Sequence, residues 1–476
     1  MRRTKIVCTL GPASNSRTEI SGLARAGMDV ARLNFSHGTH SFHREIIERV
    51  RGISDDLKRP IAILQDLPGP KIRIGSIEGG MTDLRKGSEV RFVAEDVVGT
   101  SSVISLPHAE ILAAMEPDSY FYLADGLLRM KVLENLGSSI TAKVIAGGSL
   151  GSHKGVNVPD AKLDLPPATE LDLEHLRFGM EMGVDWVAVS FVASPKDVVP
   201  FRKAAEAFGS PVKFMAKIER RQALDYLDEI VDAFDGVLVA RGDLGIETPI
   251  SDVPIVQKRL IKKCLRAGKP AVVATQMLMS MVDNPRPTRA EVTDIANAIL
   301  DGADAVMLSE ETAVGRYPLD AVRTMSETAV SADTYLAEEA PRGLLDSEEL
   351  DSVVDAIAHS AAEMADNLKV AAILCCTASG ETARAVSKHR PSVPILAAVS
   401  SEYAYNQLSL RWGVRSFKVP PPKNTDEMIS TAVAGAIDTK LVKPHDWVII
   451  VAGVQAGVPG NTSLIKYHKV GDAIWA

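Results

Sequence analysis

The chain has 476 residues and a formal net charge of −8. This length exceeds one ordinary domain, so we expect two or three globular domains with large apolar cores. The acidic balance argues against non-specific nucleic-acid binding, and no segment holds the roughly 18 uninterrupted apolar residues of a membrane helix. The N-terminal stretch reaches glycine and proline too soon for a signal peptide, and the four cysteines lack metal-type spacing. We therefore expect a cytoplasmic protein with no nucleic-acid or membrane partner.

Short apolar runs of strand length recur along the chain, each followed by a helical pattern. The eight runs are KIVCTL (5–10), VARLNF (30–35), IAILQDL (61–67), WVAVSF (186–191), VKFMAKI (212–218), GVLVARG (236–242), AVVATQ (271–276) and AVMLS (305–309). Near-continuous apolar strands that alternate with helices indicate a parallel sheet covered on both faces, and eight such units indicate a closed barrel. We predict an α/β protein built on a TIM (β/α)8 barrel.

One interval breaks this rhythm, because residues 75–155, between the third and fourth strands, are too many for a loop. Its short, glycine-bounded and partly alternating runs predict an inserted small β-barrel domain. A polar, acidic segment then marks a boundary near residue 345, and the strands and helix after it predict a C-terminal α/β domain. The predicted divisions are 1–69 and 160–345 for the barrel, 70–159 for the inserted domain and 346–476 for the C-terminal domain.

The stretch FMAKIERR (214–221) places a lysine and a glutamate in an apolar strand. Because side chains alternate along a strand, Lys217 and Glu219 project from the same side. From these residues alone, a surface ion pair explains the pattern as well as catalysis does. In a TIM barrel, however, the active site is assembled at the C-terminal ends of the strands. Polar residues end seven of the eight runs, namely Arg32, Asn34, Ser36, His37, Asp66, Ser190, Lys217, Glu219, Arg241, Gly242, Asp243, Thr275, Gln276, Ser309, Glu310 and Glu311. This shared pattern favours an active site.

Two carboxylates on adjacent strands, Glu219 and Asp243, predict a Mg²⁺ site, because this hard ion prefers oxygen ligands. The alternative is that the two acids cap or pair separately. Lys217 beside them offers a point charge to a developing oxyanion. The stretch ARGDLGIE places Gly242 and Asp243 where a helix begins, and free backbone N–H groups there bind a carboxylate or phosphate.

Other patterns exclude familiar sites. His37, His40 and His43 do not share one helix face, so we expect a solvated first helical turn rather than a zinc site. The sequence holds neither a P-loop motif nor a Rossmann dinucleotide fingerprint. Nucleotide binding would therefore use another arrangement.

Long motifs in a fixed order connect the chain to a known family. The motifs are TKIVCTLGPAS, ARLNFSHG, DLPGPKIR, KGVNVPD, VSFV, AKIERRQAL, VARGDLGIE, ATQMLMSM, NPRPTRAEVTDIANAILDGADAVMLSEETAVGRYP and TASGETARAVSK. With them the chain resembles the pyruvate kinase family over essentially its whole length. The resemblance implies phosphoryl transfer from phosphoenolpyruvate to ADP, giving pyruvate and ATP in the last step of glycolysis. It also implies a barrel with a β-domain inserted after the third strand and a C-terminal α/β regulatory domain.

The resemblance assigns roles residue by residue. Glu219 and Asp243 look like ligands of a divalent ion, with two Mg²⁺ ions expected and Mn²⁺ able to substitute. Several residues resemble the family's substrate-binding and catalytic groups. They are Arg32, which would contact the phosphate, Lys217 as the catalytic cation, the Gly242 and Asp243 amides, which would bind the carboxylate, Thr275, which would serve enolate protonation, and Ser190 and Ser309. The residues that resemble the family's nucleotide contacts are Asn34, His37, Arg73 and Lys154. The inserted domain would close as a lid, hinged near Pro70 and Pro159.

One departure from the family concerns a monovalent ion. The K⁺-dependent branch resembles this chain at Asn34, Ser36 and Asp66, but carries threonine in place of Leu67 and glutamate in place of Lys71. We hypothesise that the Lys71 ammonium group takes over the charge of K⁺, so that K⁺ is not required. The alternative is that Lys71 points to solvent.

The C-terminal stretch CCTASGETARAVSK places Thr377, Ser379, Gly380 and Thr382 between a strand and a helix. This hydroxyl-rich turn suits a phosphate and resembles the family's effector loop, although Glu381 within it would repel a phosphorylated effector. An ordinary helix cap made by Ser379 or Thr382 is the alternative. The resemblance further implies a homotetramer.

Two other functions fit part of the pattern. A lyase or aldolase that acts on pyruvate would use the same lysine, carboxylates and anion site, but the inserted domain and Arg73 argue against it. A non-enzymatic sensor built on this fold is the second alternative. The presence of Lys217, Glu219, Asp243 and Thr275 argues against a sensor.

Overall fold

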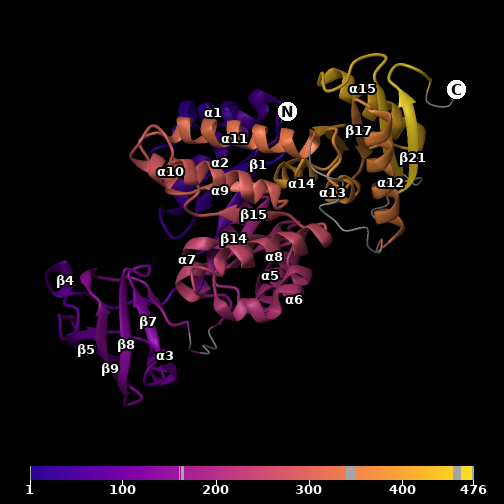
Figure 1. Ribbon diagram of the computed structural model, residues 1–476. Coiled ribbons are helices and arrows are strands. Elements are labelled where there is room, and N and C mark those ends of the chain that lie inside the picture. Colours follow the sequence, from indigo (N-terminus) through magenta and orange to yellow (C-terminus); the bar gives the residue numbers. More distant parts are fainter. Residues whose placement is uncertain are drawn as a thin grey trace.

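The computed structural model describes residues 2–159, 161, 166–338, 350, 352–453 and 462–473. Eight parallel strands close into a barrel in the spatial order β1-β16-β15-β14-β13-β12-β3-β2 (Figure 1). Their bounds are β1 Lys5–Thr9, β2 Val30–Asn34, β3 Ala62–Asp66, β12 Trp186–Val189, β13 Lys213–Ile218, β14 Gly236–Ala240, β15 Ala271–Ala274 and β16 Ala305–Leu308. Each strand lies within one of the eight predicted runs, so the TIM barrel is confirmed.

Helices surround the barrel and cover its outer face. They are α1 Arg17–Ala26, α2 His40–Leu57, α4 Glu170–Glu181, α5 Val199–Phe208, α6 Leu227–Ala233, α7 Arg241–Glu247, α8 Val253–Arg266, α9 Arg289–Leu300, α10 Glu310–Ala313 and α11 Pro318–Glu338. Capping boxes begin α1 at Ser16 and α9 at Thr288. The apolar helix faces pack on the barrel in one large core. Within the described ranges, no helix is both long and apolar enough to cross a membrane.

The alternation of β13 explains how an apolar strand carries a lysine to the site. Phe214, Ala216 and Ile218 belong to the core between the barrel and its helices, whereas Met215 belongs to the core inside the barrel. Lys217 has the parity of Met215 and therefore points inward. Because Lys217 is also near the C-terminal end of the strand, it reaches the rim where a TIM barrel builds its active site.

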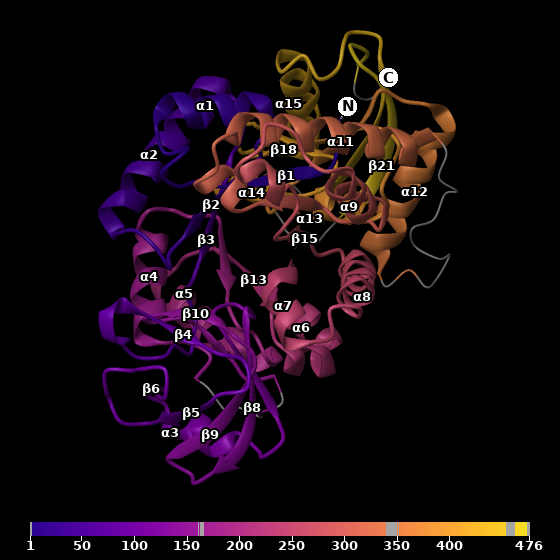
Figure 2. The same cartoon turned by 60° about the vertical axis from the view of Figure 1, so that its left-hand side comes forward.

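Between β3 and α4 the chain forms an insertion, mostly of β-strands, that stands apart from the barrel (Figure 2). Its elements are β4 Met81–Leu84, β5 Glu89–Val93, β6 Val103–Ser105, α3 Ala109–Ala114, β7 Tyr120–Leu123, β8 Leu128–Asn135, β9 Ser139–Ala146, β10 Gly148–Gly151 and β11 Val156–Asn157. The strands pair in a six-stranded sheet (β11-β7-β8-β9-β5-β6) and a two-stranded sheet (β10-β4). In place of the predicted small barrel, the described strands thus form two open sheets. They share a core of their own; the boundaries at 69/70 and 159/160 stay predictions, and Asp160 lies outside the described residues.

The C-terminal part is a five-stranded sheet with helices, in the order β19-β18-β17-β20-β21. Its elements are α12 Val353–Leu368, β17 Ala372–Cys376, α13 Glu381–Lys388, β18 Ile395–Val399, α14 Glu402–Gln407, β19 Val414–Lys418, α15 Thr425–Asp438, β20 Trp447–Gly453 and β21 Thr462–Lys469. The edge strand β21 is antiparallel to β20. The predicted α/β architecture is confirmed here, whereas the predicted boundary near residue 345 lies outside the described residues.

The C-terminal sheet packs against the N-terminal end of the barrel. Leu410, which is fully buried, belongs to the same apolar cluster as the inward-facing residues of the barrel strands. Trp186, the first residue of β12, donates its indole N–H to the Gln407 carbonyl at 3.3 Å, and Lys5, the first residue of β1, donates to the Val414 carbonyl at 2.6 Å. The C-terminal part therefore covers the barrel end opposite the rim that carries Lys217.

Replacing the buried Leu410 with alanine tests this packing. We expect Leu410→Ala to lower the free energy of unfolding by about 2–5 kcal/mol, because a cavity replaces a leucine inside the core. Urea titration measures this loss, with Leu368→Ala, at a side chain that is 49% exposed on α12, as the control. Equal losses in the two variants would contradict the packing role of Leu410.

Candidate active site

Charged side chains converge at the C-terminal ends of β2, β3, β12 and β13. Lys217 Nζ lies 3.0 Å from Glu219 Oε1 and 3.1 Å from Asp66 Oδ1, and it donates to Ser190 Oγ at 2.7 Å. Arg32 donates from Nε to Asp66 Oδ2 at 2.7 Å and forms an ion pair with the same oxygen through Nη2 at 2.6 Å. The Lys217 side chain is 13% exposed and that of Glu219 is 2% exposed. The two residues share one side as predicted, and their ion pair is buried rather than on the surface.

The charge of Lys217 is fixed by its neighbours. Burial lowers the pKa of Lys217, but the carboxylates of Asp66 and Glu219 outweigh burial and raise this pKa above its usual range. Burial raises the pKa of Asp66, but Lys217 and Arg32 outweigh burial and lower it. Near neutral pH, Lys217 is therefore an ammonium group and Asp66 a carboxylate. Lys217 can supply positive charge, but it cannot accept a proton.

Glu219 and Asp243 form the candidate metal site. Burial raises the pKa of Glu219 to about 7; Lys217 opposes this shift and Asp243 adds to it. Because the Asp243 carboxylate disfavours the ionisation of Glu219, a divalent cation beside both carboxylates would offset this repulsion, and their oxygen atoms suit Mg²⁺. Within the described ranges, no group of three or more His, Cys, Asp or Glu side chains forms a closed metal site. An ion held by two carboxylates would complete its shell with water or substrate oxygens, as Mg²⁺ usually does.

The helix predicted to begin near Gly242 is α7, and its start faces a strained turn after β15. Gly242 N–H donates to Thr275 Oγ1 at 2.8 Å, and the Thr275 hydroxyl donates to the Ala274 carbonyl at 2.6 Å. Thr275 (φ 70°) and Gln276 (φ 55°) adopt left-handed backbone conformations. For residues other than glycine this costs roughly 1–3 kcal/mol each and gathers at functional sites. The Thr275 hydroxyl is thus held in one place by the strained turn.

Ser309 follows β16 and is tied to the same turn through Glu311. The buried Glu311 carboxylate accepts the Ser309 N–H at 2.7 Å and the Leu278 N–H at 3.0 Å. It therefore joins the loops after β15 and β16. The sequence analysis predicted that Glu311 lies at the rim, but it did not predict that Glu311 connects the two loops.

Two contacts at the site escaped the sequence analysis. Thr9, at the end of β1, accepts from Arg32 Nη1 at 2.8 Å, and the Phe191 N–H donates to Glu219 Oε2 at 2.7 Å. Thr9 is the last residue of β1 and comes just before the end of the first apolar run, so a search for polar residues near strand ends would have found it. Phe191 acts through its backbone, with φ 57°, and its side-chain type carries no signal for such a contact.

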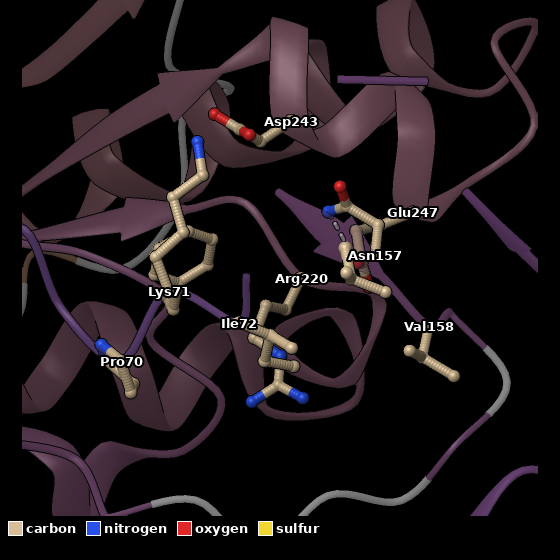
Figure 3. A pocket seen from close by; sticks show the side chains of 10 residues that line it. Pro70, Lys71, Ile72, Asn157, Val158, Arg220, Asp243 and Glu247 are labelled. Carbon is tan, nitrogen blue, oxygen red and sulfur yellow. Dashed lines mark hydrogen bonds between the residues drawn. The ribbon is translucent and has the colours of Figure 1, made fainter. Parts of the chain in front are cut away.

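A cleft separates the rim of the barrel from the insertion (Figure 3). It encloses about 430 Å³, part of it open solvent, and is lined by Pro70, Lys71, Ile72, Val156, Asn157, Val158, Phe191, Arg220, Asp243 and Glu247. Asn157 of β11 donates from Nδ2 to Glu247 Oε1 of α7 at 3.1 Å, so one hydrogen bond links the insertion to the barrel. The candidate metal ligand Asp243 therefore faces a space that both domains line.

The candidate nucleotide residues are spread over two domains. Arg73 and Lys154 are exposed on the insertion, where Arg73 Nη1 donates to the His153 carbonyl at 2.9 Å. His37 is exposed and Asn34 half-buried at the end of β2. The structure records no direct contact between these two pairs within the described ranges.

Within the described residues, the structure records no hydrogen bond or ion pair between Lys71 and the residues of the predicted monovalent-ion site, Asn34, Ser36, Asp66 and Leu67. Asn34 Oδ1 accepts the Ser36 N–H at 3.1 Å, and the Leu67 carbonyl accepts from Ser190 Oγ at 2.6 Å. Lys71 Nζ forms an ion pair with Asp125 of the insertion at 3.5 Å. Figure 3 shows the Lys71 side chain extending along the cleft toward Asp243. Lys71 thus brings a positive charge into the cleft, and its relation to K⁺ stays a prediction.

The expectation of a solvated first turn in α2 is wrong for His43. Its ring is 3% exposed and stacks on Phe35 with ring centroids 4.0 Å apart. The ring Nε2 lies 2.9 Å from the His37 carbonyl, and His40 Nε2 lies 2.7 Å from His175 Nδ1 of α4. His43 is buried on the inner face of α2, where its ring packs against the aromatic ring of Phe35. The histidines therefore anchor the segment that carries His37.

The predicted effector loop is partly engaged in contacts within the C-terminal domain. The Gly380 N–H donates to Thr377 Oγ1 at 3.0 Å, while the buried Thr382 hydroxyl is 2.8 Å from that of Thr462 on β21. Glu381 pairs with Arg384. The N-cap of α13 is Gly380, without a side-chain cap, so the alternative of a cap made by Ser379 or Thr382 is wrong. Ser379 is exposed.

His43 makes stability depend on pH. Burial lowers the pKa of His43 to about 4, and His175 and His40 add to this shift. Between about pH 6.5 and 4 the unfolded chain binds the proton and the folded chain does not, so stability falls as the pH falls. We expect this residue to lower the free energy of unfolding by about 2 kcal/mol between pH 7 and 5. His43→Phe should lose that part of the slope in urea titrations, whereas His359→Phe, at an exposed site, should keep it. Equal slopes in the wild type and His43→Phe would contradict the assignment.

Comparisons with known proteins agree with this architecture. The family model for the barrel domain of pyruvate kinase matches residues 1–322, and the model for its alpha/beta domain matches residues 355–468. The chain is 44% identical over 476 residues to pyruvate kinase of Geobacillus stearothermophilus, covering 99% of the chain and 81% of that relative. It is also 44% identical over 478 residues to pyruvate kinase of Staphylococcus aureus (strain MRSA252), covering 100% of the chain and 81% of that relative. The chain therefore belongs to the pyruvate kinase family.

Proposed function

We propose that the chain transfers the phosphoryl group of phosphoenolpyruvate to ADP, giving pyruvate and ATP. The observation that carries this proposal is the charged, buried Lys217 beside Glu219 and Asp243. Family membership and the names of the relatives support it. Two polyanions must meet in this reaction, and positioning and charge neutralisation are most of what a protein contributes.

The residues at the rim divide the work of the transfer. Arg32 would hold the phosphate, while Lys217 would stabilise the enolate oxygen that leaves phosphorus. The backbone N–H groups of Gly242 and Asp243 would receive the substrate carboxylate, with Ser190 and Ser309 beside them. The Gly242 N–H would then be shared between this carboxylate and Thr275 Oγ1. Because Lys217 stays protonated, it acts as a fixed cation and leaves proton delivery to another group.

Glu219 and Asp243 would hold one Mg²⁺, replaceable by Mn²⁺, and a second would come with the nucleotide; such ions neutralise charge on the transferring phosphoryl group. On the nucleotide side, Asn34 and His37 would contribute from the barrel and Arg73 and Lys154 from the insertion. Closure of the insertion, residues 70–159 with hinges near Pro70 and Pro159, would exclude water from the cleft.

Thr275 would serve the last step, in which the methylene carbon of the enolate gains a proton. The Thr275 hydroxyl donates to Ala274 and accepts from Gly242, which leaves one lone pair to accept from a water. That water would give a proton to carbon: its O–H bond breaks, a C–H bond forms, and solvent returns a proton to the hydroxide. Thr275 therefore orders the proton donor in this scheme.

Regulation and assembly belong to the same proposal. The turn of Thr377, Ser379 and Gly380 would receive a phosphorylated effector in the C-terminal domain, residues 346–476. The Thr382–Thr462 contact and the Glu381–Arg384 pair would have to rearrange for Thr382 to join. A homotetramer is proposed from family membership alone.

Formation of pyruvate tests the proposal and its catalytic lysine together. With phosphoenolpyruvate, ADP and Mg²⁺, we expect pyruvate and ATP in equal amounts. Lys217→Met should lower kcat by about 10²–10³-fold, because the enolate loses its counter-charge. Lys213→Met is the matched control, since Lys213 lies on the same face of β13 at its other end and pairs with Asp235 at 3.4 Å. Pyruvate and inorganic phosphate formed from phosphoenolpyruvate without ADP would indicate hydrolysis in place of transfer to ADP, and unchanged turnover in Lys217→Met would remove Lys217 from the mechanism.

Potassium dependence tests the proposed role of Lys71. We expect turnover in tetramethylammonium buffer to stay within twofold of that in KCl, because the Lys71 ammonium group supplies the missing charge. Lys71→Glu should make turnover rise at least tenfold when K⁺ is added, whereas Lys86→Glu, at an exposed site of the insertion, should not. A many-fold K⁺ requirement in the wild type would refute the hypothesis.

A further inference from the structure

Arg241 reaches across the loop after β15 and contacts the strained turn on its backbone. Its Nη2 donates to the Thr275 carbonyl at 2.6 Å and its Nε to the Ala274 carbonyl at 3.2 Å. The same guanidinium lies 2.8 Å from the Met277 sulfur. One side chain therefore satisfies two successive carbonyls where the barrel pairing of β15 ends.

The guanidinium itself is anchored from the outside. Asp294, on α9, accepts from Arg241 Nη1 at 2.6 Å. The Arg241 side chain is 13% exposed and that of Asp294 is 37% exposed. Because Arg241 is the first residue of α7, the ion pair ties α7, the turn and α9 together. An arginine fork held in this way cannot swing off the two carbonyls without breaking the ion pair.

We propose that Arg241, anchored by Asp294, holds the Thr275–Gln276 turn in its left-handed conformation and so positions the Thr275 hydroxyl for enolate protonation. Threonine is β-branched, and a positive φ is an outlier for such a residue unless neighbouring groups enforce it. Without the fork, the Thr275 carbonyl loses the Arg241 donor and the Ala274 carbonyl keeps only the Thr275 hydroxyl, so the turn can relax. The hydroxyl then leaves the Gly242 N–H. Arg241 is a positioning residue, and this inference rests on the proposed function.

The half-reaction at carbon can be measured by itself. Pyruvate in D₂O with Mg²⁺ and inorganic phosphate can enolise, but inorganic phosphate has no phosphoryl group to transfer. The exchange of methyl protons for deuterium, followed by NMR, then reports the step that Thr275 serves. We expect Arg241→Met to slow this exchange at least tenfold, while KM for phosphoenolpyruvate changes less than twofold. Arg241→Lys keeps the charge but has a single nitrogen in place of the planar fork, and its exchange rate should fall between those of the wild type and Arg241→Met.

A double variant separates positioning from general damage. If Arg241 acts through the Thr275 hydroxyl, exchange in Arg241→Met/Thr275→Ala should equal that in Thr275→Ala within twofold, because no hydroxyl remains to be positioned. Multiplication of the two single effects would overturn the proposal, and so would exchange in Arg241→Met within twofold of the wild type.

Arg51→Met is the matched control, because Arg51 holds two carbonyls and Asp185 in the same manner away from the rim. Its exchange rate per folded molecule should stay near that of the wild type. If Arg241→Met does not fold, Asp294→Asn replaces it, alone and combined with Thr275→Ala. We expect Asp294→Asn to slow the exchange at least threefold, and an unchanged exchange rate would overturn the proposal. A wild type that makes no pyruvate from phosphoenolpyruvate and ADP would instead refute the proposed function.

Discussion

Lys217 is an ammonium group with little contact with water, and burying such a charge is costly unless paired groups surround it. Asp66 and Glu219 supply that pairing, and Arg32 balances the second oxygen of Asp66. Glu219 also has the Asp243 carboxylate as a neighbour, so the single ammonium group of Lys217 is surrounded by an excess of acidic groups. In the proposed function, a divalent cation and a phosphate ester would complete this arrangement of charges. The electrostatics of the resting site and those of the reaction therefore have the same origin.

This pairing depends on the parity of one strand within a closed barrel. In β13 the outward residues build the core under the helices, and the inward ones fill the barrel up to Lys217. A shift of one residue in the register would send Lys217 into the helix layer and Phe214 into the barrel. The C-terminal part covers the opposite barrel end through Leu410 and Lys5. One end of the barrel thus packs against the C-terminal part, and the opposite end carries the charged residues of the candidate active site.

The sequence predicted the barrel because strands buried on both faces read as continuous apolar runs, as in GVLVARG. It missed β8 (LRMKVLEN) and β21 (TSLIKYHK), where charged residues alternate with apolar ones on strands with a wet face. The position of His43 could not be read from helical spacing, since Phe35 and α4 decide which face of α2 is buried. The residues at the rim could be predicted because they lie at the C-terminal ends of the predicted strands. The backbone contact of Phe191 with Glu219 required the tertiary structure.

The strained turn at Thr275 marks where local sequence preference and the fold disagree. A β-branched residue followed by glutamine is poorly suited to two successive left-handed conformations. The contacts around the turn come from three different elements: the Gly242 N–H and the Arg241 fork from α7, Asp294 from α9, and Glu311 from α10, which accepts from Leu278 just after the turn. Because these elements lie outside the turn's own sequence, the conformation of the turn depends on tertiary contacts within the barrel. A hydroxyl held by contacts from several elements is positioned more precisely than one held by its own loop alone, and the proposed delivery of a proton to a single carbon atom would need that precision.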